Sequence, residues 1–312
     1  NPYTLTFTNG EATAYMVLDQ QGRVAGLQFT QLVPATASLD AAVTALLDRP
    51  GQTSVTILRD GEIQLSRGSQ EPLAVGSAFK LAVLAAVEQA VQDGTTSWDA
   101  VLELDEGDRS LPTGIMQTWP AGSRVTVETA AILMMSRSDN TATDLLIRHV
   151  GRRAVEEHAP TSRPLLTTRE AFLLKADDQE EAREAFLSAS EAGRRRVLER
   201  LGGELPPASL FTGGPVHPQV EWFFTTAELA RLIETSERVD ILAVDPGPIN
   251  PDDWREYGYK GGSEPGVINM TIWLVAGDGT EYAVSATQSR TDAQVDTTAF
   301  VSALQAVIAH LR

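Results

Sequence analysis

The chain has 312 residues, of which 42% are hydrophobic and 21% charged, so it can build one large or two ordinary globular domains. Its formal net charge of -17 argues against nucleic acid or an anionic membrane surface as the main partner, because both select basic patches. The absence of cysteine excludes disulfides, thiolate catalysis and cysteine-ligated zinc.

Residues 1–35 predict a small β-meander. The predicted strands cover residues 3–7, 12–18 and 24–32. Asn9-Gly10 is a hairpin turn signal between the first two. Three strands without a helix bury little apolar surface by themselves. Because the sequence begins with Asn1 and not Met, we expect the meander to be the tail of an upstream small α+β domain or an appendage that docks on the main body.

Residues 36–96 and 241–312 are expected to form one α/β sheet domain. A helix is predicted over 39–48, with Ser38 as its N-cap, and a hairpin turns at Asp60-Gly61. The remaining predicted elements are strands at 257–260, 267–275 and 282–288 and a closing amphipathic helix at 300–311.

Residues 97–240 are expected to form an all-helical domain. The predicted helices cover 127–135, 141–150, 168–175, one or two stretches within 177–201, and 225–235. Strand-rich segments therefore flank a helical middle. The predicted fold class is α+β, with an antiparallel sheet flanked by helices and an inserted all-helical domain.

Ser77-Ala78-Phe79-Lys80 stands at the start of a predicted helix, where residues three apart share one face. If burial or a nearby cation keeps the Lys80 amine neutral, it can remove the proton of the Ser77 hydroxyl. Unpaired backbone N–H groups at the helix N-terminus favour developing negative charge. By itself the pattern is frequent, and an N-cap serine with a solvated lysine is the alternative.

Two further motifs follow in the chain. Ser138-Asp139-Asn140 lies between two predicted helices, and Lys260-Gly261-Gly262-Ser263 lies at the end of a predicted strand. Either one taken singly is explained by a helix cap or a solvated turn. Their occurrence together, in this order and with a helical block between them, is much less frequent by chance.

These three motifs resemble those of the serine β-lactamase and penicillin-binding protein superfamily, class A in particular. The resemblance covers residues 39–312, and Lys260-Gly261-Gly262 is similar to a divergent branch that includes β-lactamase-like proteins of clavulanic-acid gene clusters. It implies a serine β-lactamase-like fold without cofactor or metal. It also implies a secreted or periplasmic monomer, without a membrane span or nucleic-acid partner, that acts on a small-molecule β-lactam or on a peptide or ester.

The resemblance implies catalytic roles for four side chains. Ser77 would be the acylated nucleophile, and Lys80 would take or relay its proton. Ser138 would pass a proton to the leaving amide nitrogen. Lys260 would bind the substrate carboxylate and help to keep Lys80 neutral by like-charge repulsion.

The same resemblance implies a substrate-binding set. Asn140 would bind the substrate's amide, and Gly262 and Ser263 would line the substrate site. The backbone N–H groups of Ser77 and Ser263 would form the oxyanion hole. Asp139 is expected to brace its loop.

Two features depart from the class A pattern. Position 261 is glycine, so the hydroxyl of the third motif is missing. The glutamate that activates water for release of the acyl group has only Glu156, Glu157 and Glu170 as candidates, and Glu170 also fits the N3 position of a capping box opened by Thr167. Without such a base, the acyl-enzyme persists or the amine of the catalytic lysine activates water.

Three functions are therefore compatible with the sequence. The first is β-lactam hydrolysis through an acyl-enzyme, which we expect to be weak. The second is a D-Ala-D-Ala carboxypeptidase or an esterase that uses the same residues. The third is a non-hydrolytic penicillin-binding or sensor domain. An α/β-hydrolase triad has little support, since no Gly-x-Ser-x-Gly elbow occurs.

Overall fold

The computed structural model describes residues 2–8, 10–29 and 32–312, so Asn9 of the predicted Asn9-Gly10 turn lies outside the described residues. The chain divides into two compact units, Asn1–Pro50 with Asp296–Arg312, and Gly51–Val295. Helices from both ends of the chain belong to the first unit because they pack on one another. The predicted partition into domains at 36–96 with 241–312 and at 97–240 stays a prediction.

The first unit contains the predicted meander as an antiparallel sheet in which β2 pairs with β1, β3 and β4. The elements are β1 (Pro2–Phe7), β2 (Gly10–Leu18), β3 (Val24–Phe29), β4 (Val33–Pro34), α1 (Leu39–Leu47) and α11 (Thr297–Ala309). Helix α1 begins after Ser38, whose hydroxyl accepts a hydrogen bond from the Ala41 N–H, so the predicted N-cap is confirmed.

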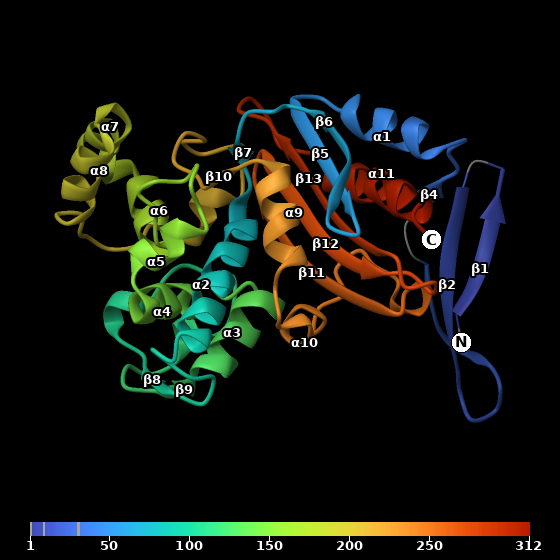
Figure 1. The fold of residues 1–312 in the computed structure, drawn as a ribbon, viewed down its shortest axis with the longest axis horizontal. Helices are drawn as coiled ribbons and strands as arrows, with labels where there is room; N and C mark the ends of the chain where they lie inside the picture. Colours follow the sequence, from blue (N-terminus) through green and yellow to red (C-terminus); the bar gives the residue numbers. More distant parts are fainter. Residues whose placement is uncertain (1, 9, 30–31) are drawn as a thin grey trace. The chain divides into compact units, whose positions relative to one another are not determined.

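The second unit is built on an antiparallel sheet with the strand order β11-β12-β13-β5-β6. Its strands are β5 (Gln52–Arg59), β6 (Glu62–Gly68), β11 (Glu256–Glu264), β12 (Val267–Val275) and β13 (Glu281–Ser289). Strand β12 is buried along its whole length, which matches its mostly apolar sequence, with Asn269 and Thr271 as the two polar exceptions. Helix α9 (Thr226–Glu234) packs on β5, β12 and β13 and lies along one face of the sheet (Figure 1).

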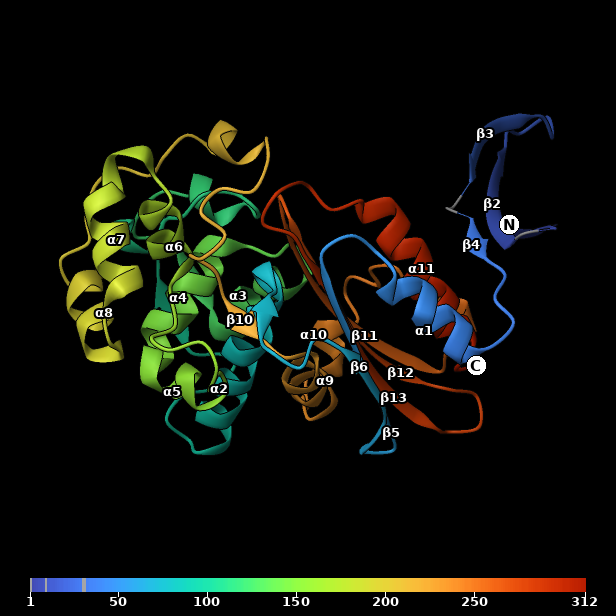
Figure 2. The same ribbon diagram turned by 90° about the horizontal axis from the view of Figure 1, so that it is seen from above.

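The other helices of this unit gather beside the sheet, and α6, α7 and α8 lie furthest from it in both views (Figures 1 and 2). The α-helices are α2 (Lys80–Gln92), α3 (Val127–Ser136), α4 (Asn140–Val150), α5 (Arg152–Glu157), α6 (Thr168–Leu174), α7 (Glu180–Ser188), α8 (Glu191–Leu198) and α10 (Val239–Leu242). The 3-10 helices are η1 (Gly76–Phe79), η2 (Glu106–Asp108), η3 (Met116–Thr118), η4 (Asp177–Gln179), η5 (Ala208–Phe211) and η6 (Pro251–Asp253).

Two short antiparallel strand pairs were not expected from the sequence. They are β7 (Leu73–Ala74) with β10 (Phe223–Phe224), and β8 (Val101–Glu103) with β9 (Arg124–Thr126). Strands of two or three residues are too short to show an alternating pattern, so only tertiary pairing reveals them.

The core of the second unit holds η1 in place. The ring of Phe79 stacks on that of Trp222, with ring centroids 4.2 Å apart and planes within 5° of each other. The N–H of Val75, just before η1, donates to the Trp222 carbonyl at 3.0 Å. Both contacts fix the backbone on either side of Ser77.

The third motif lies at the end of strand β11, as predicted, but the strand extends beyond its predicted boundary at Lys260. Strand β11 continues through Gly261 and Gly262 to Glu264, with Gly262 opposite Asn269 of β12. The sequence pattern did not predict this continuation, because the two glycines weaken the strand signal. A Cβ atom on Gly262 would lie 2.2 Å from the carbonyl oxygen of Val75, so glycine lets the chain at η1 pack directly on the edge strand.

We predict that Gly262→Ala destabilises the protein by about 1–3 kcal/mol, because the added methyl group overpacks the contact between β11 and η1. Urea unfolding measures the effect. Gly277→Ala is the matched control, since a Cβ atom there meets nothing within 4 Å, and it should stay within about 0.5 kcal/mol of the wild type. Equal unfolding midpoints for the two variants would contradict the prediction.

Candidate active site

Ser77 and Lys80 face one another across a single turn. Ser77 lies in η1 and Lys80 is the first residue of α2. Side chains three residues apart eclipse in a 3-10 turn, which brings the Lys80 Nζ to 3.2 Å from the Ser77 Oγ. The hydroxyl is half-buried and the amine is fully buried. The structure thus rejects the alternative of a solvated lysine.

The Ser138 motif supplies the other neighbours of the buried amine. Lys80 Nζ donates to the Ser138 carbonyl oxygen at 2.6 Å and to the Asn140 Oδ1 at 2.7 Å, and it lies 3.1 Å from the Ser138 Oγ. Ser138 has a φ of 51°, a left-handed conformation that is uncommon for serine. That conformation turns both its carbonyl and its hydroxyl towards the amine, as is typical of strain kept at a functional site.

A second buried amine, from β11, reaches the same hydroxyl. The Lys260 Nζ lies 3.0 Å from the Ser138 Oγ and donates to the Gly261 carbonyl at 2.9 Å. The Ser138 hydroxyl therefore lies between two lysine amines, which lets it pass a proton from one group to another. The structure brings all four predicted catalytic side chains together.

Burial controls the charge of both amines. It lowers the pKa of Lys80 well below the usual 10.5, and the positive charge of Lys260 lowers it further, against the opposing effect of Asp144 and Asp139. Burial also lowers the pKa of Lys260, to about 7. The site therefore favours a neutral Lys80 amine, the form that accepts a proton.

Asp139 braces the loop that carries Ser138, as the sequence predicts. Its Oδ2 accepts hydrogen bonds from the backbone N–H groups of Ile115 and Met116 at 2.6 and 2.9 Å. Its Oδ1 accepts from the Ala142 N–H at 2.9 Å and caps helix α4. The carboxylate is completely buried, so it replaces water for three backbone donors.

Asn140 holds the amine from the opposite side. Its Nδ2 donates to the Leu111 carbonyl at 2.9 Å, which orients its Oδ1 towards Lys80. Thr113 from the same loop donates to the Ser138 carbonyl at 2.6 Å. The sequence reasoning missed this supporting loop, because neither Leu111 nor Thr113 belongs to a motif.

The two backbone nitrogens predicted for the oxyanion hole meet where β11 packs on η1. A Cβ atom on Gly76 would lie 3.2 Å from the Ser263 nitrogen, and one on Gly262 would lie 2.5 Å from the Ser77 nitrogen. Ser263 itself is exposed. Glycines on both sides are what allow the two chain segments to approach so closely.

Tyr259 occupies the space in which a side chain at position 261 would lie. A Cβ atom on Gly261 would be 2.0 Å from the Tyr259 hydroxyl oxygen. The missing hydroxyl of the third motif is therefore a packing requirement of this chain. Gly261 and Tyr259 lie on the face of β11 opposite to Lys260, because side chains alternate along a strand.

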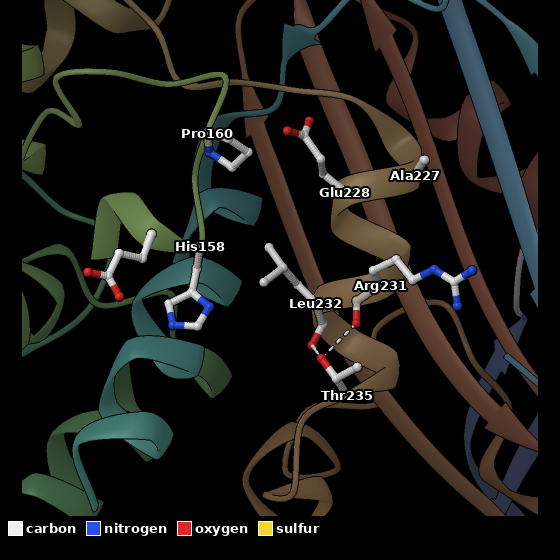
Figure 3. Close-up of a pocket in the computed structure, with 8 residues that line it drawn as sticks. His158, Pro160, Ala227, Glu228, Arg231, Leu232 and Thr235 are labelled. Atoms are coloured by element: carbon white, nitrogen blue, oxygen red, sulfur yellow. Dashed lines mark hydrogen bonds between the residues drawn. The ribbon is translucent and has the colours of Figure 1, made fainter. Parts of the chain in front are cut away.

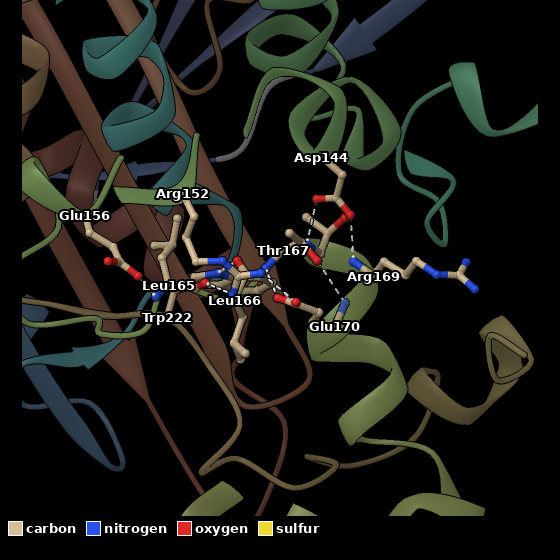
Figure 4. Close-up of polar contacts among 10 residues, drawn as sticks. Asp144, Arg152, Glu156, Leu165, Leu166, Thr167, Arg169, Glu170 and Trp222 are labelled. Carbon is tan, nitrogen blue, oxygen red and sulfur yellow. Dashed lines mark hydrogen bonds and ion pairs between the residues drawn. The ribbon is translucent and has the colours of Figure 1, made fainter. Parts of the chain in front are cut away.

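Glu170, named from the sequence as a possible base for deacylation, is engaged in local contacts (Figure 4). Its Oε2 accepts from the Thr167 N–H at 2.9 Å, which confirms the predicted capping box, and its Oε1 pairs with Arg152 at 2.6 Å. Because both oxygens have partners within α5, α6 and their flanks, we assign Glu170 to the structure of this region.

The other two candidate glutamates also have other surroundings. Glu156 is buried, with Oε1 accepting from the Leu165 N–H and Oε2 paired with Arg195. Glu157 lines a hollow of about 370 Å³ between α5 and α9, together with His158 (Figure 3). Neither has a described contact with Ser77.

Asp144 links the site to α6. Its carboxylate accepts from the N–H groups of Thr168 and Arg169 at 2.7 and 2.8 Å, at the start of that helix (Figure 4). Burial raises its pKa to about 7, against the lowering effect of these hydrogen bonds. Asp144 is one helical turn after Asn140, and neither the motif nor its spacing indicated this role.

Two absences hold for the part of the chain that the structure describes. Its residues contain no cluster of three or more histidine, aspartate or glutamate side chains arranged to hold a metal ion. Among the helices of residues 2–8, 10–29 and 32–312, none combines the length and apolar character required to cross a bilayer.

The model of the β-lactamase enzyme family matches residues 38–202, which is more than half of the chain. A β-lactamase structure from Sphaerobacter thermophilus DSM 20745 is 21% identical, with a TM-score of 0.61 over 88% of this chain and 95% of that one. PBP-A is 16% identical, with a TM-score of 0.57 over 88% and 94% of the two chains. An ancestral class A β-lactamase is 18% identical, with a TM-score of 0.59 over 88% and 99%.

At these identities the likeness to solved structures establishes the fold alone. The antiparallel sheet with its helices matches the class A fold, so the predicted fold class is confirmed. No curated protein matches the chain in sequence.

We predict that Asp139→Ala destabilises the protein by about 3 kcal/mol, because it leaves buried backbone donors without an acceptor. Urea unfolding at pH 7 provides the measurement. Ser38→Ala is the control, since it removes a single exposed cap and should cost about 1 kcal/mol. A loss in Asp139→Ala no larger than that of the control would show that Asp139 does not brace the site.

Proposed function

The chain belongs to the β-lactamase enzyme family, and from this premise we propose that it is a serine hydrolase that opens β-lactam rings by transferring the acyl group to Ser77. The observation that carries this proposal is the buried Lys80 amine, 3.2 Å from the Ser77 hydroxyl and shifted towards its neutral form. Ser77, Lys80, Ser138 and Lys260 meet within a single chain, and we propose that the protein acts as a monomer.

In the first step, the Ser77 Oγ attacks the carbonyl carbon of the lactam while its proton moves to the Lys80 Nζ. The new carbon–oxygen bond turns the carbonyl into an oxyanion, which accepts hydrogen bonds from the N–H groups of Ser77 and Ser263. One such donor typically stabilises the transition state by about 2.7–4 kcal/mol.

In the second step, the carbon–nitrogen bond breaks and the lactam nitrogen takes the proton of the Ser138 hydroxyl. Ser138 regains a proton from Lys80, which lies 3.1 Å away, and the amine returns to its neutral form. Lys260 lies 3.0 Å from the same hydroxyl, where its positive charge attracts the carboxylate that a β-lactam carries and disfavours a charged Lys80.

Release of the acyl group requires a base for the incoming water. Glu170 is engaged by Thr167 and Arg152, so we assign this role to the neutral Lys80 amine and expect slow turnover. The same observation supports the non-hydrolytic alternative, a penicillin-binding protein that keeps its acyl group. A structure of a PBP-A mutant is an acyl-enzyme complex with penicillin G.

We predict that Ser77→Ala abolishes the covalent adduct that the wild type forms with a chromogenic cephalosporin or with penicillin G. Intact-mass spectrometry over time detects the adduct and, by its disappearance, the release step. Ser66→Ala, which removes an exposed hydroxyl of β6, is the control and should acylate like the wild type. An unmodified wild-type chain, or an adduct that persists in Ser77→Ala, would refute the proposal.

A second prediction concerns pH. Because the pKa of Lys260 is about 7, this residue is charged below pH 7 and loses its attraction for a substrate carboxylate above it. The acylation efficiency for a β-lactam with a carboxylate should fall by roughly tenfold per unit above pH 7, since this quantity reports the free enzyme. A p-nitrophenyl ester without a carboxylate lacks this loss of attraction, so the ratio of the β-lactam efficiency to the ester efficiency should fall above pH 7. Identical profiles for both substrates would exclude the role of Lys260.

A further inference from the structure

Two buried charged residues and one half-buried charged residue form a cluster outside the proposed catalytic set. The Lys175 Nζ contacts a carboxylate oxygen of Glu221 and lies 2.5 Å from the Glu264 Oε2. The side chains of Lys175 and Glu221 are 1% and 2% exposed, and that of Glu264 is 18% exposed. The three residues come from the end of α6, the segment before β10 and the last position of β11.

This cluster adjoins the proposed oxyanion hole through two connections. Glu264 directly follows Ser263, and it lies on the same face of β11 as Gly262, because side chains alternate along a strand. That face packs on the backbone of Val75 and Ser77.

The second connection runs through Glu221. It directly precedes Trp222, whose ring stacks on Phe79 of η1 and whose carbonyl accepts from the Val75 N–H. The cluster therefore ties the strand that carries one oxyanion donor to the segment that supports the other.

The cluster carries one positive and two negative groups. Burying the resulting net charge is costly, because each ion loses its hydration. The Glu221 Oε2 is buried and has no hydrogen-bond donor in the structure. A single proton between the two carboxyl groups would remove the net charge and give this oxygen a partner.

The electrostatics of the individual groups agree with this geometry. Burial, and then the negative charge of Glu264, raise the pKa of Glu221 well above its usual 4.5. Burial also acts to raise the pKa of Glu264, but the ammonium of Lys175 holds it below its usual value, with a smaller lowering effect from Lys80. The side chain of His217 also interacts with Lys175. Burial is the largest cause that lowers the pKa of His217, and Arg183 and Lys175 lower it further against the opposing charges of Asp177 and Glu180.

We propose that Lys175, Glu221 and Glu264 form a buried clamp, with one proton shared by the two carboxyl groups, that holds the Ser263 amide in place opposite the Ser77 amide. The three are positioning residues. The clamp rests on the proposed function, since the spacing of the two amides matters only where an oxyanion forms between them. Loss of the shared proton leaves a buried net charge and loosens the clamp.

The shared proton is tested by stability and needs no substrate. Because the folded-state pKa of Glu221 is raised, the stability it contributes is complete below about pH 4.5 and is lost as pH rises through the folded-state value. The Glu221→Gln variant keeps the shape of the side chain but removes the carboxyl group that ionises. Between pH 5 and pH 9, the urea midpoint of Glu221→Gln should rise relative to that of the wild type. If the midpoints of the two proteins change with pH in parallel, the two carboxyl groups do not share a proton.

The positioning role is tested by acylation with a p-nitrophenyl ester, which avoids the carboxylate effect of Lys260. Glu264→Ala should slow acylation at saturating ester by about 10- to 100-fold, the scale of a misplaced reacting group. Glu264→Gln, whose amide oxygen still accepts from Lys175, should restore most of the rate. Glu88→Gln changes a buried glutamate of α2 that bonds Ser236, and it is the control with unchanged acylation.

A third readout separates positioning from general damage to the fold. Wild-type acylation by the ester should decline at alkaline pH as the clamp loses its proton, and Glu221→Gln should lack this decline. If Glu264→Ala does not fold, the comparison of Glu221→Gln with the wild type decides the proposal. Equal rates in Glu264→Ala and the wild type, or the same alkaline decline in Glu221→Gln, would overturn the clamp.

The proposed function and the clamp fail in distinguishable ways. A wild-type chain that β-lactams and esters never acylate overturns the proposed function and, with it, the positioning role of the clamp. The stability comparison still decides the shared proton in that case. A wild type that is acylated at Ser77, combined with unaffected clamp variants, overturns the clamp alone.

Discussion

The direct packing of η1 on the edge strand β11 is the contact on which the rest of the site depends. Gly262 permits it, because any side chain there would collide with the carbonyl oxygen of Val75. The contact brings the backbone nitrogens of Ser77 and Ser263 to one place and lets Lys260 reach the Ser138 hydroxyl. An edge strand suits this arrangement, since one of its sides is left without a partner strand.

Burial then decides the chemistry of the groups that this contact assembles. Lys80 is fully enclosed and has oxygen neighbours from Ser77, Ser138 and Asn140, yet its pKa is lowered because the charged form has lost its hydration. The nearby carboxylate of Asp139 is committed to backbone donors. An amine that burial keeps neutral can accept the proton of the neighbouring serine hydroxyl, and this activates the hydroxyl as a nucleophile.

Several polar side chains around the site make structural contacts. Asp139 and Asn140 hold the loop of the second motif, and Asp144 holds the start of α6. Glu170 is committed to a capping box and to Arg152. Because Glu170 is engaged in these contacts, the geometry supports acylation better than release of the acyl group. We assign the release step to the amine of Lys80.

The sequence by itself determined the main helices and strands, the capping residues Ser38 and Thr167, and the motifs that contain Ser77 and Ser138, because periodicity and caps are local properties. Only the tertiary structure decided that β11 continues through its glycines and that Glu170 is occupied. It also decided that Lys175 meets Glu221 and Glu264. Such contacts join residues far apart in the chain, and burial, which sets their charges, exists only once the fold encloses them.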